Sequence, residues 1–255
     1  MAVRPRTLVI IPAYNEAGSI ASVLDELARR AAWADVVVID DGSSDQTAAI
    51  ARAAGAVTLS LPCNLGVGGA VQTGYQYACA HGYEVAVQFD ADGQHRAAEI
   101  EGLVSALVAQ KADLVVGSRT VDRLAYRFNP ARFIGSRLLS VLVSRITRQR
   151  VSDPTSGFRA ASARTIGFFA EHYPQTYLAD TAEALVWASR GGLRIVEIPA
   201  RMRQRKTGTS ATTSLRGFLH TLRIVLAVLV DCLEKPITAA DNPATSPPPR
   251  ADLES

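Results

Sequence analysis

Short apolar runs alternate with amphipathic segments along the first half of the chain. The apolar runs have the length of buried strands, and we expect strands at 7–13, 35–40, 57–61, 84–90 and 112–117. The segments between them carry apolar side chains at helical spacing, and we expect helices at 17–31, 44–54, 66–80 and 97–110. Ser43 or Ser44 is the expected cap of the second helix. This repeated strand-helix order predicts an α/β fold with a mainly parallel sheet.

The pattern changes after Arg119. Residues 121–129 are polar and predict a mobile segment, and a helix is expected over 131–148. Five apolar residues fall on one predicted face of that helix, namely Leu138, Leu139, Leu142, Val143 and Ile146. Three arginines fall on the opposite face, namely Arg137, Arg145 and Arg148. The helix therefore either packs on the sheet with a solvated basic face or lies in the headgroup region of an anionic membrane.

A last helix is expected over about 215–233. Its longest uninterrupted apolar run, 224–230, is far shorter than the roughly 20 residues that span a bilayer, so we expect no membrane span. From residue 235 onward, prolines, alanines and charges without periodicity predict disorder. The expected organisation is one domain over 1–234, which ends in an amphipathic helix at 215–234, and a disordered tail over 235–255.

Acidic side chains follow two of the predicted strands. Residues 90–95 read DADGQH, and residues 40–43 read DDGS. Ligands of open α/β sheets bind beyond the carboxyl ends of the strands, which is where these motifs lie. Two carboxylates separated by one residue can hold a divalent cation against a diphosphate, although an isolated pair of this kind is also common in solvated surface turns.

Composition excludes some classes of function. A net charge of +3 is too small to indicate nucleic-acid binding without a clustered basic patch. The three cysteines, Cys63, Cys79 and Cys232, are scattered and have neither metal-type spacing nor a disulfide framework, which favours a reducing cytoplasm. The first seven residues do not have the pattern of a signal peptide.

Further motifs occur in order, each at the end of an apolar run. They read IIPAYNE at 10–16, DDGSSDQT at 40–47, NLGVGGA at 64–70 and GSR at 117–119. Together with DADGQH, this set resembles the family 2 glycosyltransferases and, within them, the polyprenyl-phosphate (dolichyl-phosphate) sugar synthases. The segments SDPTSGFR at 152–159 and RKTGTS at 205–210 are similar to signatures of that subfamily. The resemblance covers about residues 7–210.

The resemblance implies a GT-A fold, which is a Rossmann-like and mainly parallel sheet flanked by helices. It implies an inverting, metal-dependent hexosyltransferase that moves a sugar from a GDP- or UDP-linked donor to a polyprenyl phosphate. A phosphate acceptor is already ionised at neutral pH and needs no general base. The alternatives are a soluble acceptor, such as a natural product or a carrier-bound intermediate, and a nucleotide-sugar-binding protein without catalysis. The last is disfavoured because every metal-site position is filled.

The resemblance also implies where the donor binds. The base and ribose are expected at Pro12, Ala13, Tyr14 and Glu16, with Asp41 as a hydrogen-bond acceptor. For Tyr14 the alternative is a buried anchor at the sheet edge. Gly68, between Gly66 and Gly69, would let the backbone approach the donor at a helix start, although helix-sheet packing explains such glycines equally well.

The expected metal ligands are Asp90, Asp92 and Gln94, around Mg²⁺ or Mn²⁺ on the diphosphate, and Asp92 is also expected to be catalytic. His95 is either a metal ligand or base, or a residue that supports the site. Arg203 and Arg205 resemble a loop that closes over the diphosphate, and Arg205 is expected to be catalytic. A solvated basic loop is the alternative.

The acceptor phosphate is expected at Arg119, which matches the GSR motif, and at Arg132, for which Arg137 could substitute. Residues 153–159 are expected to line the acceptor side, or Asp153 caps a turn. Glu183 lies near the catalytic carboxylate of relatives with hydroxyl acceptors, or it is a helix-surface charge.

The expected partners are a nucleotide-sugar donor, a polyprenyl phosphate or a soluble acceptor, and a membrane surface or a small membrane protein. Nucleic acid is not expected. The location is the cytoplasm or the inner face of the cell membrane. The sugar and the base stay open.

Overall fold

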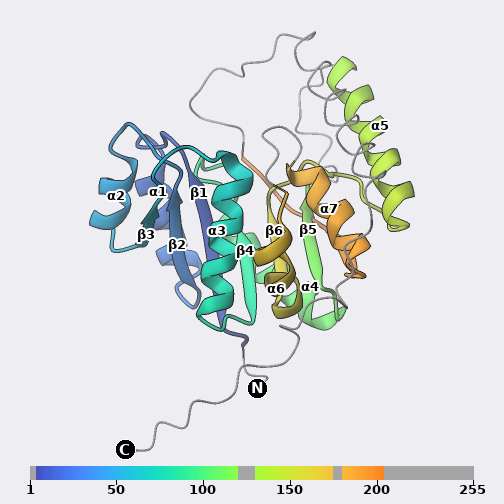
Figure 1. Ribbon diagram of the computed structural model, residues 1–255, viewed down its shortest axis with the longest axis horizontal. Helices are drawn as coiled ribbons and strands as arrows, with labels where there is room; N and C mark the ends of the chain where they lie inside the picture. The colour runs from blue at the N-terminus through green and yellow to red at the C-terminus, as the bar shows by residue number, and fades with distance from the viewer. Residues whose placement is uncertain (1–3, 120–129, 175–179, 204–255) are drawn as a thin grey trace, which may run out of the picture.

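A computed structural model describes residues 4–119, 130–174 and 180–203, of which 130–136 and 180 are described by their backbone alone. Seven strands form one sheet in the order β3-β2-β1-β4-β6-β5-β7 (Figure 1). They are β1 (Thr7–Ala13), β2 (Asp35–Asp40), β3 (Val57–Ser60), β4 (Val85–Gln88), β5 (Leu114–Ser118), β6 (Arg159–Ser162) and β7 (Ile195–Pro199). β6 is antiparallel to β4 and β5, and the other neighbours are parallel. The expected mainly parallel α/β sheet is confirmed.

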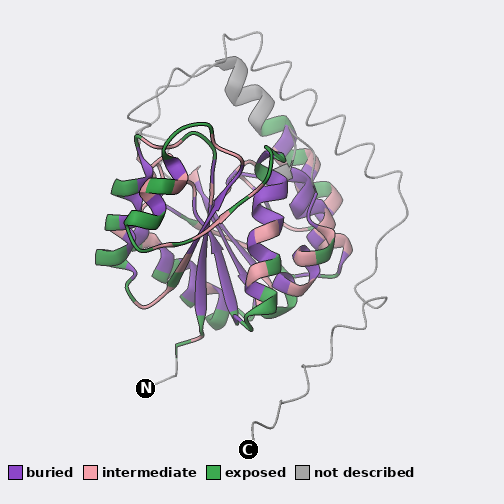
Figure 2. Ribbon diagram, turned by 60° about the vertical axis from the view of Figure 1, so that its left-hand side comes forward, coloured by how far each residue is buried: buried purple, intermediate pink, exposed green. Residues whose placement is uncertain are grey.

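Helices cover both faces of the sheet. One layer contains α3 (Gly66–Ala80), α5 (Pro130–Thr147), α6 (Ala163–His172) and α7 (Asp180–Arg190), and the other contains α1 (Ile20–Arg30), α2 (Thr47–Ala53) and α4 (Ile100–Ala109). In β1, Leu8 and Ile10 belong to the core under the first layer, and Val9 and Ile11 belong to the core under the second. The strand is apolar at consecutive positions because both of its faces are buried (Figure 2).

Helix α3 packs very closely on β1. A Cβ atom on Gly74 would lie 2.2 Å from Cγ2 of Ile10, so this position has no space for a larger residue. The close approach holds the N-terminus of α3 beside the carboxyl ends of β1 and β2, where the candidate site begins. Residues 66–80 and 35–40 form the helix and the strand that the sequence predicts.

The predicted cap of the second helix is wrong. Neither Ser43 nor Ser44 caps it, since α2 begins at Thr47. Asp45 instead satisfies one backbone donor at the start of the helix, because its Oδ1 accepts a hydrogen bond from the Thr47 N–H at 2.9 Å. The helix predicted at 97–110 also differs, because it opens with a 3-10 turn over Ala97–Glu99 before α4 begins.

Helix α5 packs on the molecule through part of its predicted apolar face. Leu139 and Val143 are buried in the core, which supports the sheet-packing interpretation of this helix. Leu138 does not share their face, since it is 58% exposed. Adjacent helical residues point about 100° apart, so the apolar residues cover a wider arc of the helix than the part that is buried against the core. The exposed side therefore combines Leu138 and Val141 with arginines.

Several predicted segments lie outside the described residues. They are the polar segment 121–129, the helix at 215–233, the tail from 235, Arg205 and Cys232. Within the described ranges, no helix has both the length and the apolar character needed to cross a bilayer.

Candidate functional site

The loops after β1, β2, β4 and β5 gather at the carboxyl edge of the sheet, which is the upper edge in Figure 1. Backbone hydrogen bonds join these loops to neighbouring strands. The Asp41 N–H donates to the Ala13 carbonyl at 2.9 Å, and the Gly117 N–H donates to the Phe158 carbonyl at 2.8 Å. The predicted motifs therefore share one edge, as the strand order requires.

The loops after β1 and β2 are tied together by side chains. The Asn15 N–H donates to Ser43 Oγ at 3.0 Å, and the Ser44 N–H donates to Asn15 Oδ1 at 2.9 Å. Glu16 belongs to the same network, since its N–H donates to Thr47 Oγ1 at 2.8 Å. This network builds a fixed wall at the predicted base and ribose position.

The predicted donor residues of the first loop differ in exposure. Pro12 and Glu16 are partly exposed, and Ala13 is buried. Tyr14 is 48% exposed, so the alternative of a buried anchor is wrong. Its ring is available to a ligand at the edge of the sheet.

Asp41 is buried at the N-terminus of α3. Its Oδ1 accepts from the Leu65 N–H at 2.7 Å, and its Oδ2 accepts from the Gly66 N–H at 3.0 Å. Burial raises the pKa of Asp41, and the two backbone N–H groups offset part of that effect. A carboxylate at this end of a helix is stabilised by the helix dipole. Asp41 therefore has a structural role in addition to the predicted ligand contact.

The glycines at the start of α3 have packing roles. Gly66 has φ +83°, a conformation that favours glycine. A Cβ atom on Gly69 would lie 2.7 Å from the Leu65 Cβ, which supports the packing interpretation there. Gly68 is buried in the first turn.

The motif DADGQH forms one turn beyond β4. Asp92 Oδ1 accepts from the Gln94 N–H at 2.9 Å, and its Oδ2 accepts from Gln94 Nε2. Gly93 has φ +74°, which allows the turn to reverse tightly. The Asp90 side chain is 38% exposed, and Asp92 is also partly exposed. The predicted metal ligands Asp90, Asp92 and Gln94 therefore lie on one turn, in which Asp92 and Gln94 are in contact.

His95 is buried behind this turn. Its Nδ1 accepts from the Asp90 N–H at 2.9 Å, and its Nε2 lies 3.3 Å from Asp90 Oδ2. Burial lowers the pKa of His95, and the charges of Asp90 and Asp92 oppose that effect. Because both ring nitrogens face Asp90, the geometry favours a supporting role over that of a metal ligand or base.

The turn fits a cation that is shared with phosphate. Among the side chains that the structure describes, no three His, Cys, Asp or Glu residues form a group able to hold a metal ion. Mg²⁺ at phosphate sites needs only one or two carboxylates, since waters and phosphate oxygens complete its coordination. Two partly exposed carboxylates and an amide on one turn match this requirement.

Arg119 is held by Asp153 at the end of β5. Arg119 Nε donates to Asp153 Oδ2 at 2.8 Å, and its Nη2 donates to Asp153 Oδ1 at 3.0 Å and to Thr155 Oγ1 at 2.7 Å. Burial alone would raise the pKa of Asp153, but the hydrogen bonds and charge of Arg119 outweigh it and hold the pKa below its ordinary value. Asp153 is therefore an ion-pair partner, a role that the sequence reasoning missed.

The segment 152–159 contains a second arginine with a different environment. Arg159 is buried, and it donates to the carbonyls of Ser156 at 2.8 Å, Pro154 at 3.2 Å and Thr181 at 2.6 Å. These bonds tie the segment to the start of α7. Glu183 on α7 is also buried, so its interpretation as a helix-surface charge is wrong.

Arg203, the last described residue, contacts the DADGQH turn. Its N–H donates to the Gln94 carbonyl at 2.8 Å, and its Nη2 donates to Glu26 Oε1 at 2.9 Å. The hydrogen bonds that Arg203 donates to the Glu26 carboxylate raise the pKa of Arg203. Arg203 therefore braces the turn against α1. The side chain of Arg132 and all of Arg205 lie outside the described residues.

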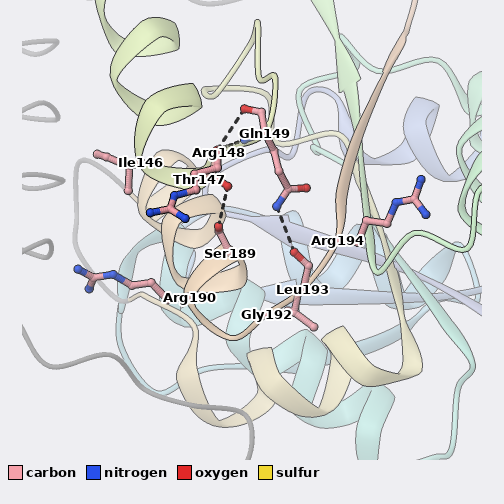
Figure 3. Close-up of a pocket in the computed structure, with 9 residues that line it drawn as sticks. All are labelled: Ile146, Thr147, Arg148, Gln149, Ser189, Arg190, Gly192, Leu193 and Arg194. Carbon is pink, nitrogen blue, oxygen red and sulfur yellow. Dashed lines mark hydrogen bonds between the residues drawn. The ribbon is translucent and has the colours of Figure 1, made fainter.

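A separate hollow lies away from these motifs. It is bounded by the C-terminal ends of α5 and α7 and by the residues before β7, which is the opposite edge of the sheet (Figure 3). Arg190 and Arg194 point to opposite sides of it. Their charges do not converge on a ligand, so the candidate site is at the carboxyl edge.

Several proteins with similar sequences are named as sugar transferases or synthases. An undecaprenyl-phosphate mannosyltransferase of Micrococcus luteus is 32% identical over 80% of this chain and 86% of its own. A polyprenol monophosphomannose synthase of Mycolicibacterium smegmatis is 30% identical over 82% of each chain. A UDP-N-acetylglucosamine--dolichyl-phosphate N-acetylglucosaminyltransferase of Methanococcus voltae is 27% identical over 88% of this chain and 97% of its own.

The fold is also found in a solved glycosyltransferase structure. Glucosyl-3-phosphoglycerate synthase of Mycobacterium tuberculosis, crystallised with Mn²⁺, UDP and glucosyl-3-phosphoglycerate, gives a TM-score of 0.62. The alignment covers 91% of this chain and 81% of that one at 21% identity, and it confirms the GT-A fold. The family model of Glycosyl transferase family 2 matches residues 8–168. With the motifs of that span at one sheet edge, the chain belongs to glycosyl transferase family 2 and is a glycosyltransferase.

Proposed function

We propose that this protein transfers a hexose from a GDP- or UDP-linked donor to a polyprenyl phosphate, with inversion and with Mg²⁺ or Mn²⁺. The names of the relatives support a polyprenyl-phosphate acceptor. The observation that carries the proposal is the pairing of two features at one sheet edge. These are the carboxylate turn beyond β4 and the Arg119–Asp153 ion pair beyond β5.

The donor side of the proposal uses the first two loops and the metal turn. Asp90, Asp92 and Gln94 would hold the cation, which supplies Lewis-acid stabilisation of the leaving diphosphate. Mn²⁺ in the glucosyl-3-phosphoglycerate synthase crystals supports a divalent ion. The base and ribose would lie on the wall formed by Pro12, Ala13, Tyr14 and Glu16, with Asp41 at the start of α3.

The acceptor side uses arginines. Arg119 is fixed in direction by Asp153, which also neutralises its charge. An acceptor phosphate therefore needs a further cation, and Arg132, for which Arg137 could substitute, is the proposed source. Guanidinium groups suit this task because they bind phosphate oxygens in pairs and stay charged. The phosphate attacks the sugar carbon opposite the leaving diphosphate, which inverts that carbon, and it needs no base because it is already ionised.

Peripheral attachment to a membrane is part of the proposal. The exposed side of α5 presents Leu138 and Val141 beside Arg137 and Arg145, and the exposed Arg148 follows the helix directly. Apolar and basic side chains together are the pattern of helices that bind anionic lipid surfaces. Such attachment would bring the carboxyl edge to a lipid-linked acceptor.

A donor screen tests this function. GDP- and UDP-sugars are incubated with and without a polyprenyl phosphate, and release of the nucleoside diphosphate is followed. We expect release that depends on the lipid phosphate and on a divalent cation, with the sugar recovered on the lipid. Equal release without the lipid, and no labelled lipid, would favour a soluble acceptor instead.

A further inference from the structure

The Asp90 carboxylate lies between two segments that are distant in sequence. On one side, His95 Nε2 is 3.3 Å from Asp90 Oδ2. On the other side, the Gly157 backbone approaches so closely that a Cβ atom there would lie 3.1 Å from Asp90 Oδ1 and 3.4 Å from Oδ2. The carboxylate is therefore confined by both neighbours.

The hydrogen bond at Nδ1 of His95 determines the tautomer of the neutral ring. The Asp90 N–H donates to Nδ1 at 2.9 Å, so Nδ1 carries a lone pair and no proton. In the neutral ring the proton is then on Nε2, the nitrogen that faces the Asp90 carboxylate. His95 thus holds both the backbone and the side chain of Asp90.

The ring of His95 is itself fixed by aromatic packing. It stacks on Phe158 with a centroid distance of 4.7 Å and an interplanar angle of 25°. Phe89 meets it edge-on at 5.4 Å. Phe158 follows Gly157 directly, so one short segment both orients His95 and approaches Asp90.

Position 157 favours glycine because there is little space for a side chain there. Gly157 is not among the glycines with positive φ, so its backbone conformation permits alanine. The added methyl group would also lie 3.2 Å from Gln88 Nε2. Contacts of 3.0–3.4 Å require the neighbour to shift by a few tenths of an ångström. Both carboxylate oxygens of Asp90 lie in this distance range, so alanine at position 157 would push against the Asp90 carboxylate.

We propose that His95 and Gly157 are positioning residues that orient Asp90 toward the donor cation. This inference rests on the proposed metal site. Residues that orient a metal ligand typically change metal affinity by 10–100-fold when they are replaced. The segment that carries Gly157 also carries Asp153, so the metal turn and the Arg119 pair share one support.

Binding of Mn²⁺ tests the proposal without an activity assay. Free Mn²⁺ is measured by electron paramagnetic resonance during titration of the protein, alone and with UDP or GDP. His95→Phe retains an aromatic ring and removes both the hydrogen bond at Nδ1 and the Nε2 contact with the Asp90 carboxylate. His95→Asn retains an acceptor near the Nδ1 position, and His95→Gln retains a donor near the Nε2 position. His172→Phe on α6 is the matched control, and Gly102→Ala, whose Cβ would meet nothing within 4 Å, is the control for Gly157→Ala.

We expect His95→Phe to weaken Mn²⁺ binding roughly tenfold, with the Asn and Gln variants in between. Gly157→Ala should weaken binding as well, and the two controls should bind as the natural protein does. A long-range ¹H–¹⁵N spectrum of the metal-free protein should show the Nε2–H tautomer of His95. If His95→Phe does not fold, the Asn and Gln variants decide the question.

The outcomes separate this inference from the proposed function. Unchanged Mn²⁺ affinity in the folded His95 and Gly157 variants, or an Nδ1–H tautomer, would overturn the positioning role and leave the metal site intact. Loss of binding in Asp92→Ala establishes that the signal comes from that site. No Mn²⁺ binding by the natural protein would overturn the metal site and the inference together.

Discussion

Replacing Asp153 by asparagine should destabilise the fold by removing the charge that Arg119 requires. The Asp153 side chain is almost fully buried and accepts three hydrogen bonds from Arg119. Breaking a buried ion pair typically costs about 3–5 kcal/mol. Arg119 is 29% exposed and Asn retains one acceptor oxygen, so we expect a loss of about 2–3 kcal/mol at pH 7.

The loss should depend on pH in a defined direction. The pKa of Asp153 is lower in the folded protein than its ordinary value of 3.8, so the carboxylate stabilises the fold above that value. This contribution disappears as the pH falls through the folded pKa. The difference between the natural protein and Asp153→Asn should therefore be constant near neutral pH and shrink below pH 3.8.

Urea unfolding measures both effects. A loss of about 2–3 kcal/mol corresponds to a midpoint shift of about 1 M for a protein of this size. The control is Asp25→Asn, which removes the exposed pair with Arg29 and should cost less than about 1 kcal/mol. Equal midpoints for Asp153→Asn and the natural protein at pH 7, or a difference that persists unchanged in acid, would refute this reasoning.

Three further predictions concern the metal, the core and the membrane. Asp92→Ala should lower transfer more than about a hundredfold in a nucleoside diphosphate release assay while circular dichroism stays unchanged. Gly74→Ala should lower the free energy of unfolding, measured by urea denaturation, by about 1–3 kcal/mol, because the added methyl group would clash with Ile10. The protein should co-sediment with anionic vesicles, and Arg145→Gln should weaken that binding by about 1 kcal/mol. High salt should weaken the binding as well.

A specific outcome would contradict each of these predictions. Full turnover in excess chelator would exclude the metal role of Asp92. A Gly74→Ala variant as stable as Gly102→Ala would show that the core can expand around α3. Indifference to vesicles, combined with transfer to a soluble acceptor, would exclude the membrane role of α5.

Local sequence predicted the features that depend on neighbouring residues. The bounds of β2 and α3 follow from apolar runs and glycines, and Asp90, Asp92 and Gln94 share a turn because they are adjacent in sequence. The strand-helix alternation likewise predicts the parallel sheet.

Contacts between distant segments were not predictable in the same way. Arg119 and Asp153 are 34 residues apart, and Arg203 and Glu26 are 177 apart, so only the folded sheet edge brings them together. Strand β6 has the sequence RAAS, which lacks an apolar run. Its arginine donates to the carbonyls of Pro154, Ser156 and Thr181, and single-sequence patterns do not reveal these contacts.

The antiparallel direction of β6 has a consequence for the order in which the protein matures. Because β6 runs against β4 and β5, the residues that precede it reach the carboxyl edge, and Gly157 and Phe158 arrive beside Asp90 from a part of the chain synthesised much later. A nascent chain that has completed β1 to β5 already contains every proposed cation ligand and His95, but it lacks Gly157 and Phe158. If Asp90 binds the donor cation as proposed, the cation site would be completed only after β6 has been synthesised.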